Sequence, residues 1–199
     1  MSTNYAYVPV TLKKDKIMKS DLQFSTNHIN VPDLSAFQRI VLNTNGSVTD
    51  ILESYLSEPI HLFKLSEKLA KMERELPNIK SSKEEPVFAR KVLLRGKISR
   101  RNFVYAHSWI LIDNLDERFS HDLLNTKTPI GKLWSQQKVE TFKEIIDSGK
   151  EPANGLSDYF CVEPEENMLF RTYSVLSQGK PTMIITEKFP ESYFRQNFR

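Results

Sequence analysis

From residue 87 onward, apolar side chains recur at every second position over several segments, a pattern typical of strands with one buried face. In residues 87–94 and 181–189 this alternation places one charged residue on each apolar face. The two faces carry Phe88, Arg90, Val92 and Leu94 in the first segment, and Met183, Ile185, Glu187 and Phe189 in the second. Because a buried charge is costly unless it is paired or used, Arg90 and Glu187 are the positions most indicative of function.

Three interpretations of these charges are open. Arg90 and Glu187 form one buried ion pair, or each strand lies at an edge of the sheet with its charge in water. In the third, both line an enclosed pocket, where Arg90 is a planar fork for a substrate carboxylate and Glu187 is an acid or base. His107 presents a similar choice: it shares its strand face with Tyr105 and Trp109, and is either a core residue or a pocket residue.

The remaining patterns place helices before hairpins. Helical spacing predicts a helix over 34–41, capped by Asp33 or Ser35, and a second short helix that starts at Ser47 or Thr49. The elements that follow are a strand at 59–65, a polar solvated connection at 67–86, a hairpin of strands 87–95 and 103–112, helices at 115–124 and 128–134, a segment 138–146 that fits strand or helix, a loop at 151–158, and a final hairpin of strands 169–176 and 181–189.

This order of elements predicts an α+β domain, an antiparallel sheet flanked by helices, over residues 33–199. Residues 1–32 mix lysines with scattered apolar side chains, and we interpret them as an arm that leads into the domain. In the alternative, Tyr5, Tyr7 and Val10 form an edge strand.

Composition narrows the classes of function. The 199 residues include 28 Lys and Arg and 25 Asp and Glu, a net charge of +3. The basic residues between 95 and 101 have no aromatic side chains among them, so we expect a solvated hairpin tip and no nucleic-acid partner. No run of about 18 apolar residues and no signal-peptide pattern occurs, and Cys161 is the single cysteine. We therefore expect a cytoplasmic protein without a membrane span.

Metal and cofactor motifs do not occur in the sequence. The four histidines never stand three or four residues apart, and the six glycines form neither a dinucleotide fingerprint nor a phosphate loop. We expect no metal and no cofactor. The function classes that remain are cofactor-free acid–base chemistry, ligand binding and a purely structural role.

Seven short motifs stand in a specific order along the chain. They are Asn45-Gly46-Ser47-Val48-Thr49, Arg90-Lys91-Val92-Leu93-Leu94, Phe103-Val104-Tyr105-Ala106-His107-Ser108, Thr128-Pro129-Ile130-Gly131, Glu140-Thr141-Phe142-Lys143-Glu144, Gly179-Lys180-Pro181 and Thr186-Glu187-Lys188-Phe189. Together they resemble the chorismate pyruvate-lyase family over roughly residues 40–194. The likeness is greatest to the actinobacterial branch, which supplies 4-hydroxybenzoate for phenolic lipids, and more distant to the ubiquinone-pathway enzyme.

The resemblance implies an antiparallel sheet flanked by helices, with an internal pocket closed by flaps. It also implies conversion of chorismate to 4-hydroxybenzoate and pyruvate without metal or cofactor. The family's pocket arginine, which holds the ring carboxylate, falls on Arg90. Its glutamate falls on Glu187, which either assists proton transfer at C4 or protonates the departing ether oxygen. The flap positions that touch the ligand fall near Val48 and Ile130.

One position departs from the family pattern. A second arginine of the ubiquinone-pathway enzyme falls on His107, and the actinobacterial branch also lacks an arginine there. Chorismate is a dianion, so a second cation is needed for its side-chain carboxylate. The candidates, in this order, are Arg171, Lys180 and His107.

Two other functions compete with this hypothesis. The ligand-sensing domains of GntR-type repressors resemble chorismate lyase and bind small effectors without catalysis, but residues 1–40 are short and irregular for a winged helix-turn-helix. A stand-alone protein that binds an aromatic acid is the main alternative. A related activity that turns chorismate into another hydroxybenzoate isomer is the other.

Overall fold

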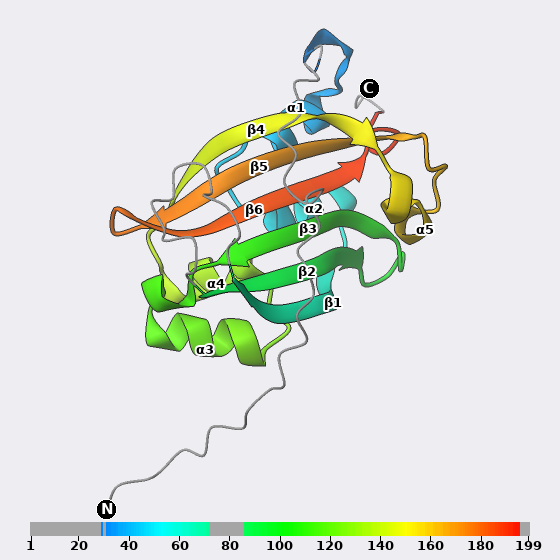
Figure 1. Ribbon diagram of the computed structural model, residues 1–199. Helices are drawn as coiled ribbons and strands as arrows, with labels where there is room; N and C mark the ends of the chain where they lie inside the picture. The colour runs from blue at the N-terminus through cyan, green and yellow to red at the C-terminus, as the bar shows by residue number, and fades with distance from the viewer. Residues whose placement is uncertain (1–28, 30, 72–85, 196–199) are drawn as a thin grey trace, which may run out of the picture.

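The computed structural model describes residue 29, residues 31–71 and residues 86–195. Their centre is one six-stranded antiparallel sheet with the strand order β1-β2-β3-β6-β5-β4 (Figure 1). The strands are β1 (Ile60–Lys71), β2 (Pro86–Gly96), β3 (Asn102–Ile110), β4 (Phe142–Pro152), β5 (Asn167–Ser177) and β6 (Lys180–Pro190). The prediction of an α+β domain on an antiparallel sheet is confirmed.

Four helices bury their apolar stripes against the sheet in two separate clusters, and in Figure 1 α3 is seen below the edge formed by β1. One cluster joins α1 (Ala36–Asn43) and α2 (Val48–Leu56) to one end of the strands. The other joins α3 (Glu117–Asn125) and α4 (Ile130–Gln137) to the other end. The short elements are α5 (Ser157–Phe160) and the 3-10 turns η2 (Val31–Asp33), η3 (Ile112–Asn114) and η4 (Asn154–Leu156).

The helix starts follow the capping chemistry of the sequence. Ser35 and Gln38 form a reciprocal capping box at the start of α1, and the Ser47 hydroxyl accepts a hydrogen bond from the Asp50 backbone N–H at the start of α2. Asp116 caps α3 in the same way. The predicted caps Ser35 and Ser47 are confirmed.

Three predicted segments differ from the structure. Residues 67–71 belong to β1 rather than to a solvated connection, because this edge strand accommodates polar side chains and Glu67 pairs with Arg90 across the β1–β2 ladder. The ambiguous segment 138–146 is strand from Phe142 onward, where β4 begins, and its first residue, Lys138, is the C-cap of α4. Residues 151–158 are only partly loop, since β4 extends to Pro152 and η4 and α5 follow. Residues 1–28, with the proposed strand at Tyr5–Val10, lie outside the described residues.

On the helix-covered face, the central strands carry polar side chains between two apolar ends. Along β2, Phe88 belongs to one apolar cluster and Leu94 to the other, with Arg90 between them. Along β6, Met183 and Phe189 belong to the two clusters and Glu187 lies between them. These charged side chains therefore lie between the two clusters, next to a small apolar cluster of Leu62, Val92 and Ala106, and this is where the pocket lies.

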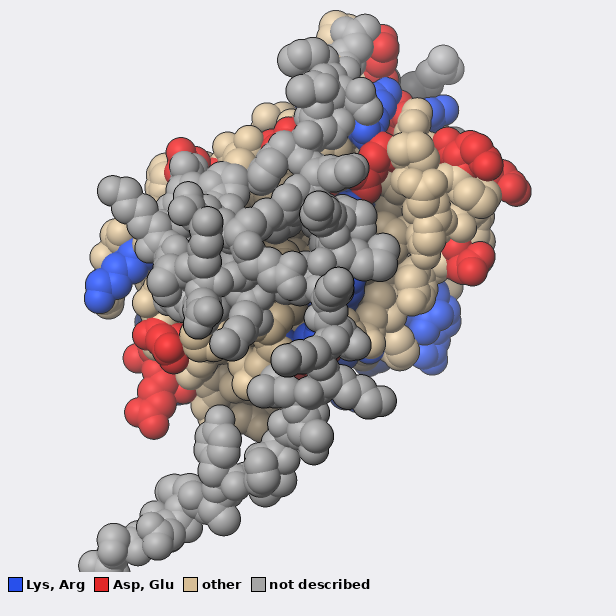
Figure 2. All heavy atoms as spheres, viewed as in Figure 1, with Lys and Arg blue, Asp and Glu red and all other residues tan. Residues whose placement is uncertain are grey.

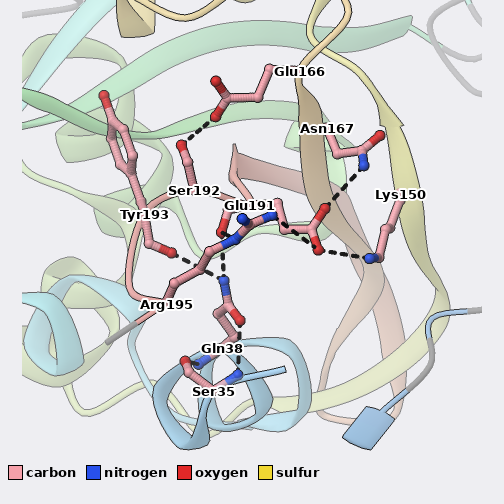
Figure 3. A network of polar contacts seen from close by, with 9 residues as sticks. All are labelled: Ser35, Gln38, Lys150, Glu166, Asn167, Glu191, Ser192, Tyr193 and Arg195. Carbon is pink, nitrogen blue, oxygen red and sulfur yellow. Dashed lines mark hydrogen bonds and ion pairs between the residues drawn. The ribbon is translucent and has the colours of Figure 1, made fainter. Parts of the chain in front are cut away.

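A polar network fastens the end of β6 to α1 (Figure 3). The buried Gln38 amide donates hydrogen bonds to the backbone oxygens of Glu191 (2.7 Å) and Tyr193 (3.0 Å), while its oxygen accepts one from the Ser35 backbone N–H. The Glu191 carboxylate in turn pairs with Lys150 on β4. The network fixes the position of α1, and with it the loop at residues 44–47 that reaches the pocket.

In the described ranges, no helix is both long and apolar enough to cross a membrane. Among the described residues visible in Figure 2, basic and acidic side chains are interspersed around the rim of the molecule. This mixture agrees with the small net charge of the sequence.

Candidate active site

A pocket lies on the helix-covered face, between the two apolar clusters. The sheet forms its floor, and the first residues of α2 and α4 form its cover. Its lining consists of Ser47, Val48, Thr49, Leu62, Arg90, Val92, Leu94, Ala106, Ser108, Pro129, Ile130, Gly131, Trp134, Lys143, Tyr173, Ile185 and Glu187. Most of these side chains are apolar, and the few charged ones converge from different strands, as is typical of small-molecule sites.

The two parts of the cover touch each other at Gly131. A Cβ atom at this position would lie 2.6 Å from the Ser47 Oγ and 3.1 Å from its Cβ. Only a residue without a side chain allows this approach without a shift. The starts of α2 and α4 are thus closely packed over the pocket.

Arg90 reaches the pocket from β2 and is 1% exposed. Its Nε lies 3.0 Å from Glu67 Oε1, and Glu67 also accepts a hydrogen bond from Lys64. Burial lowers the pKa of Arg90, and the Glu67 carboxylate partly offsets that effect. Within the described part of the chain, Nη1 and Nη2 are buried without a hydrogen-bond partner. The guanidinium therefore has the two parallel donors that bind a carboxylate bidentately.

Glu187 reaches the pocket from β6 and is held at both oxygens. Arg171 on β5 donates from Nε to Oε2 at 2.8 Å, and the Tyr173 hydroxyl donates to Oε1 at 3.0 Å. Arg171 is fully buried, and its Nη1 donates to the Thr44 carbonyl at 2.7 Å. Burial and the neighbouring Glu187 carboxylate raise the pKa of Tyr173 well above its usual value, so this hydroxyl remains a donor. Two fixed donors orient the carboxylate toward the pocket.

Lys143 enters from the edge strand β4 and is 8% exposed. Its Nζ donates to the Gly46 carbonyl at 2.7 Å and lies 5.0 Å from the centre of the Trp134 ring and 5.4 Å from that of Tyr173. Burial lowers its pKa to about 8, although the Glu187 carboxylate acts in the opposite direction. The pocket therefore contains an ammonium group whose pKa is lowered from its usual value to about 8.

Four of the predicted site residues line this pocket: Arg90, Glu187, Val48 and Ile130. Arg171 lies directly behind it, in contact with Glu187. The two interpretations that placed the charges elsewhere are wrong. Arg90 pairs with Glu67 and Glu187 with Arg171 rather than with each other, and their strands are both interior strands of the sheet.

The structure does not bring Lys180 or His107 to the pocket. Lys180 is exposed at the β5–β6 turn, seven residues from Glu187 along β6, which corresponds to roughly 23 Å of extended strand. On β3, Ala106 and Ser108 line the pocket, so the side chain between them points to the opposite face. There the His107 ring lies 4.9 Å from that of Trp109.

Sequence reasoning missed three residues that shape the site. Lys143 lies within the Glu140–Glu144 motif. The sequence fits a strand or a helix there, so it does not predict which way the Lys143 side chain points. Tyr173 and Arg171 alternate with Phe170 and Thr172, a pattern that fits either face of the sheet and gives no sign of the contact between Tyr173 and Glu187. Glu67 lies in a polar stretch, and only the register of β1 against β2 reveals its pairing. Among the described residues, no three His, Cys, Asp or Glu side chains are arranged to hold a metal ion.

The family assignment follows from comparison with known proteins. A family profile described as "Chorismate pyruvate-lyase Rv2949c-like" matches residues 42–196. The chain belongs to this family. Arg90, Glu187 and the whole pocket lining fall within the matched range, so the resemblance inferred from the short motifs is confirmed.

Relatives of this chorismate pyruvate-lyase family member include a chorismate pyruvate-lyase of Mycobacterium leprae, which is 31% identical over 81% of this chain and 77% of its own length. A chorismate pyruvate-lyase of Mycobacterium tuberculosis is 29% identical over 79% of this chain and 81% of its own length.

Among solved structures, the effector domain of PhnF from Mycobacterium smegmatis has the same fold. Its TM-score is 0.60 at 8% sequence identity, with 78% of this chain and 94% of that domain covered. The ligand-binding domain of a GntR-family regulator from Bordetella bronchiseptica matches with a TM-score of 0.52 at 14% identity, with 71% of this chain and 88% of that domain covered. At these identities, the likeness extends to the fold alone.

Proposed function

We propose that this protein is a chorismate pyruvate-lyase that converts chorismate to 4-hydroxybenzoate and pyruvate. One observation carries the proposal: in a member of the chorismate pyruvate-lyase family, a buried arginine with two unpartnered donors and an oriented glutamate line the same pocket. The arginine suits a carboxylate, and the glutamate suits proton transfer beside it.

Substrate binding begins at Arg90. Its Nη1 and Nη2 hold the ring carboxylate, and the ring lies between β2 and β6, toward Glu187. These strands are separated by β3, so their backbones lie roughly 10 Å apart. That spacing suits a six-membered ring with a carboxylate at one end and the reacting carbons at the other. Val48 and Ile130 cover the ring and exclude water.

The chemical step is an elimination that makes the ring aromatic. Glu187 removes the proton from C4, the C–H electrons form the new C3–C4 double bond, and the C3–O bond to the enolpyruvyl group breaks. The leaving enolpyruvate takes up one proton and becomes pyruvate, so atoms and charge balance. Arg171 and Tyr173 hold the Glu187 carboxylate in a fixed orientation, one at each oxygen, from which it can take up the proton. Aromatisation drives the reaction, and the pocket supplies position and a dry environment.

The test is incubation of the purified protein with chorismate in EDTA, followed by chromatography of the aromatic products and an assay for pyruvate. We expect 4-hydroxybenzoate and pyruvate in equal amounts. Glu187→Gln should lower kcat by about 10²- to 10⁴-fold. Arg90→Ala should weaken the binding of both chorismate and 4-hydroxybenzoate by about 100-fold or more, because a buried carboxylate loses its partner.

Glu151→Gln is the matched control for Glu187→Gln, since Glu151 also loses an ion pair, with Lys188, but lies outside the pocket lining. Thermal unfolding of each variant shows whether it is folded. Full activity in Arg90→Ala would refute the proposal.

A binding protein without catalysis is the second candidate, because the fold is shared with effector and ligand-binding domains of regulators. Unchanged chorismate together with tight binding of 4-hydroxybenzoate would support this candidate and exclude the lyase.

A further inference from the structure

The proposed substrate has two carboxylates, and Arg90 accounts for only one of them. The second belongs to the enolpyruvyl group, which is attached next to the reacting carbon. A pocket that binds this dianion needs a second cation on the side of Glu187 away from Arg90.

The three charged groups that line the pocket come from strands in a fixed order. Arg90 stands on β2, Glu187 on β6 and Lys143 on β4, and the sheet order places β6 between the other two. The substrate has the same order of groups: ring carboxylate, reacting carbons, enolpyruvyl carboxylate. The position of Lys143 thus corresponds to that of the second carboxylate.

Arg171 is less suited to this task. Its Nε is engaged by Glu187 and its Nη1 by the Thr44 carbonyl. Its Nη2 has no hydrogen-bond partner among the described residues, but Arg171 is not part of the pocket lining. Lys143 Nζ has three N–H donors, and the Gly46 carbonyl is its only hydrogen-bond acceptor among the described residues. Two donors therefore remain for a ligand.

A purely structural role accounts for one donor of Lys143, which holds the Gly46 carbonyl, but not for the other two N–H groups of this buried ammonium. The contacts of Nζ with the Trp134 and Tyr173 rings offset only part of the cost of burying the ammonium, since burial still lowers the pKa of Lys143. A ligand carboxylate compensates that cost, because it pairs with the buried charge.

We propose that Lys143 binds the enolpyruvyl carboxylate and so distinguishes chorismate from its aromatic product. This assignment rests on the proposed lyase function and names the second anion site of the same pocket. 4-Hydroxybenzoate lacks the enolpyruvyl group and binds through Arg90 alone. Lys143 therefore contributes to substrate affinity and not to product affinity.

The pH dependence follows from the surroundings of Lys143. The titratable groups that face it are Glu187 on β6, Arg171 and Tyr173 on β5, and Asp50 on α2. Burial raises the pKa of Tyr173; burial also lowers that of Arg171, but the Glu187 carboxylate reverses this effect, so both keep their protons. Lys143 has a pKa of about 8 in the free protein, and only its protonated form attracts the carboxylate. The value of kcat/KM should therefore fall as the pH rises through about 8.

The experiment compares wild type, Lys143→Met, Lys143→Arg and the control Lys97→Met, whose lysine is exposed at the β2–β3 turn. Steady-state kinetics give KM and kcat, and calorimetry gives the Kd of 4-hydroxybenzoate. Lys143→Met should raise the KM for chorismate about 10- to 100-fold and leave the Kd of 4-hydroxybenzoate within about threefold of wild type. Lys143→Arg should keep much of the affinity and lose the fall of kcat/KM near pH 8.

Two results would overturn the assignment. One is an unchanged KM in Lys143→Met, and the other is an equal loss of chorismate and 4-hydroxybenzoate binding, which indicates a structural role. If the wild type binds chorismate but does not convert it, the lyase proposal fails, and the same comparison of Kd values for the two ligands still decides the role of Lys143. If chorismate does not bind at all, both proposals fail.

Discussion

At the scale of single residues, the shape of a cation matters as much as its charge. Arg90 has a planar fork with two free donors, whereas a lysine at this position keeps the charge but presents a single ammonium group. We expect Arg90→Lys to weaken the binding of chorismate and of 4-hydroxybenzoate by the same factor, about 10- to 100-fold, because both ligands have the ring carboxylate. Calorimetry with 4-hydroxybenzoate and kinetics with chorismate measure this, with the exposed Arg118→Lys as the control. Unequal losses for the two ligands would contradict the assigned role.

Residue-level prediction from the sequence worked where a charge interrupts an apolar pattern. Arg90 and Glu187 stood out because strand alternation gives each side chain a face, and both indeed line one pocket. Alternation does not give the partner of a charge. The contacts of Glu187 with Arg171 and Tyr173, and of Arg90 with Glu67, depend on which strands are neighbours and in which register. That information is tertiary, and so these partners were not predicted.

At the scale of secondary-structure elements, the pocket is closed by the contact between the starts of α2 and α4. A Cβ in Gly131→Ala would collide with Ser47 and push the two helices apart. Overpacking of this kind lowers the free energy of unfolding by about 1–3 kcal/mol. The higher helix propensity of alanine offsets about 1 kcal/mol of that loss. We expect the KM for chorismate to rise roughly fivefold or more.

The double variant Gly131→Ala with Ser47→Gly tests whether the collision with Ser47 causes the rise in KM. Glycine removes the colliding atoms and is tolerated at a helix N-cap at a cost of a few tenths of a kcal/mol, so it should restore KM toward the wild-type value. If the double variant binds chorismate no better than Gly131→Ala, the contact with Ser47 is not what the alanine disturbs.

Most elements could be predicted because their signals are local. Ser35 and Ser47 start helices through hydrogen bonds within one turn, and Ser177–Lys180 mark the turn of the last hairpin. The segment at Phe142 was ambiguous because apolar spacing there fits either period. Pairing with β5 makes it an edge strand, and this in turn directs Lys143 into the pocket.

At the scale of the whole molecule, the site depends on a loop that is held from a distance. The carbonyls of Thr44 and Gly46 bind Arg171 and Lys143, and their loop directly follows α1. α1 is held by Gln38, which joins it to the segment after β6 (Figure 3). The composition and element order predicted an α+β domain, but a link of this kind spans more than 150 residues of sequence and has no local signal.

Removal of this link should therefore loosen the domain and the site together. Gln38→Ala removes a buried amide that makes three hydrogen bonds. It leaves the Tyr193 backbone oxygen without a donor among the described residues, and the Glu191 backbone oxygen with Arg195 Nε alone. We expect a loss of about 3 kcal/mol of unfolding free energy, which corresponds to a fall in Tm of roughly 6–12 °C for a chain of this size. Urea and thermal unfolding measure the loss, and Gln136→Ala, an exposed glutamine on α4, is the control that should change little. Equal unfolding curves for the two variants would mean that the link to α1 does not stabilise the domain.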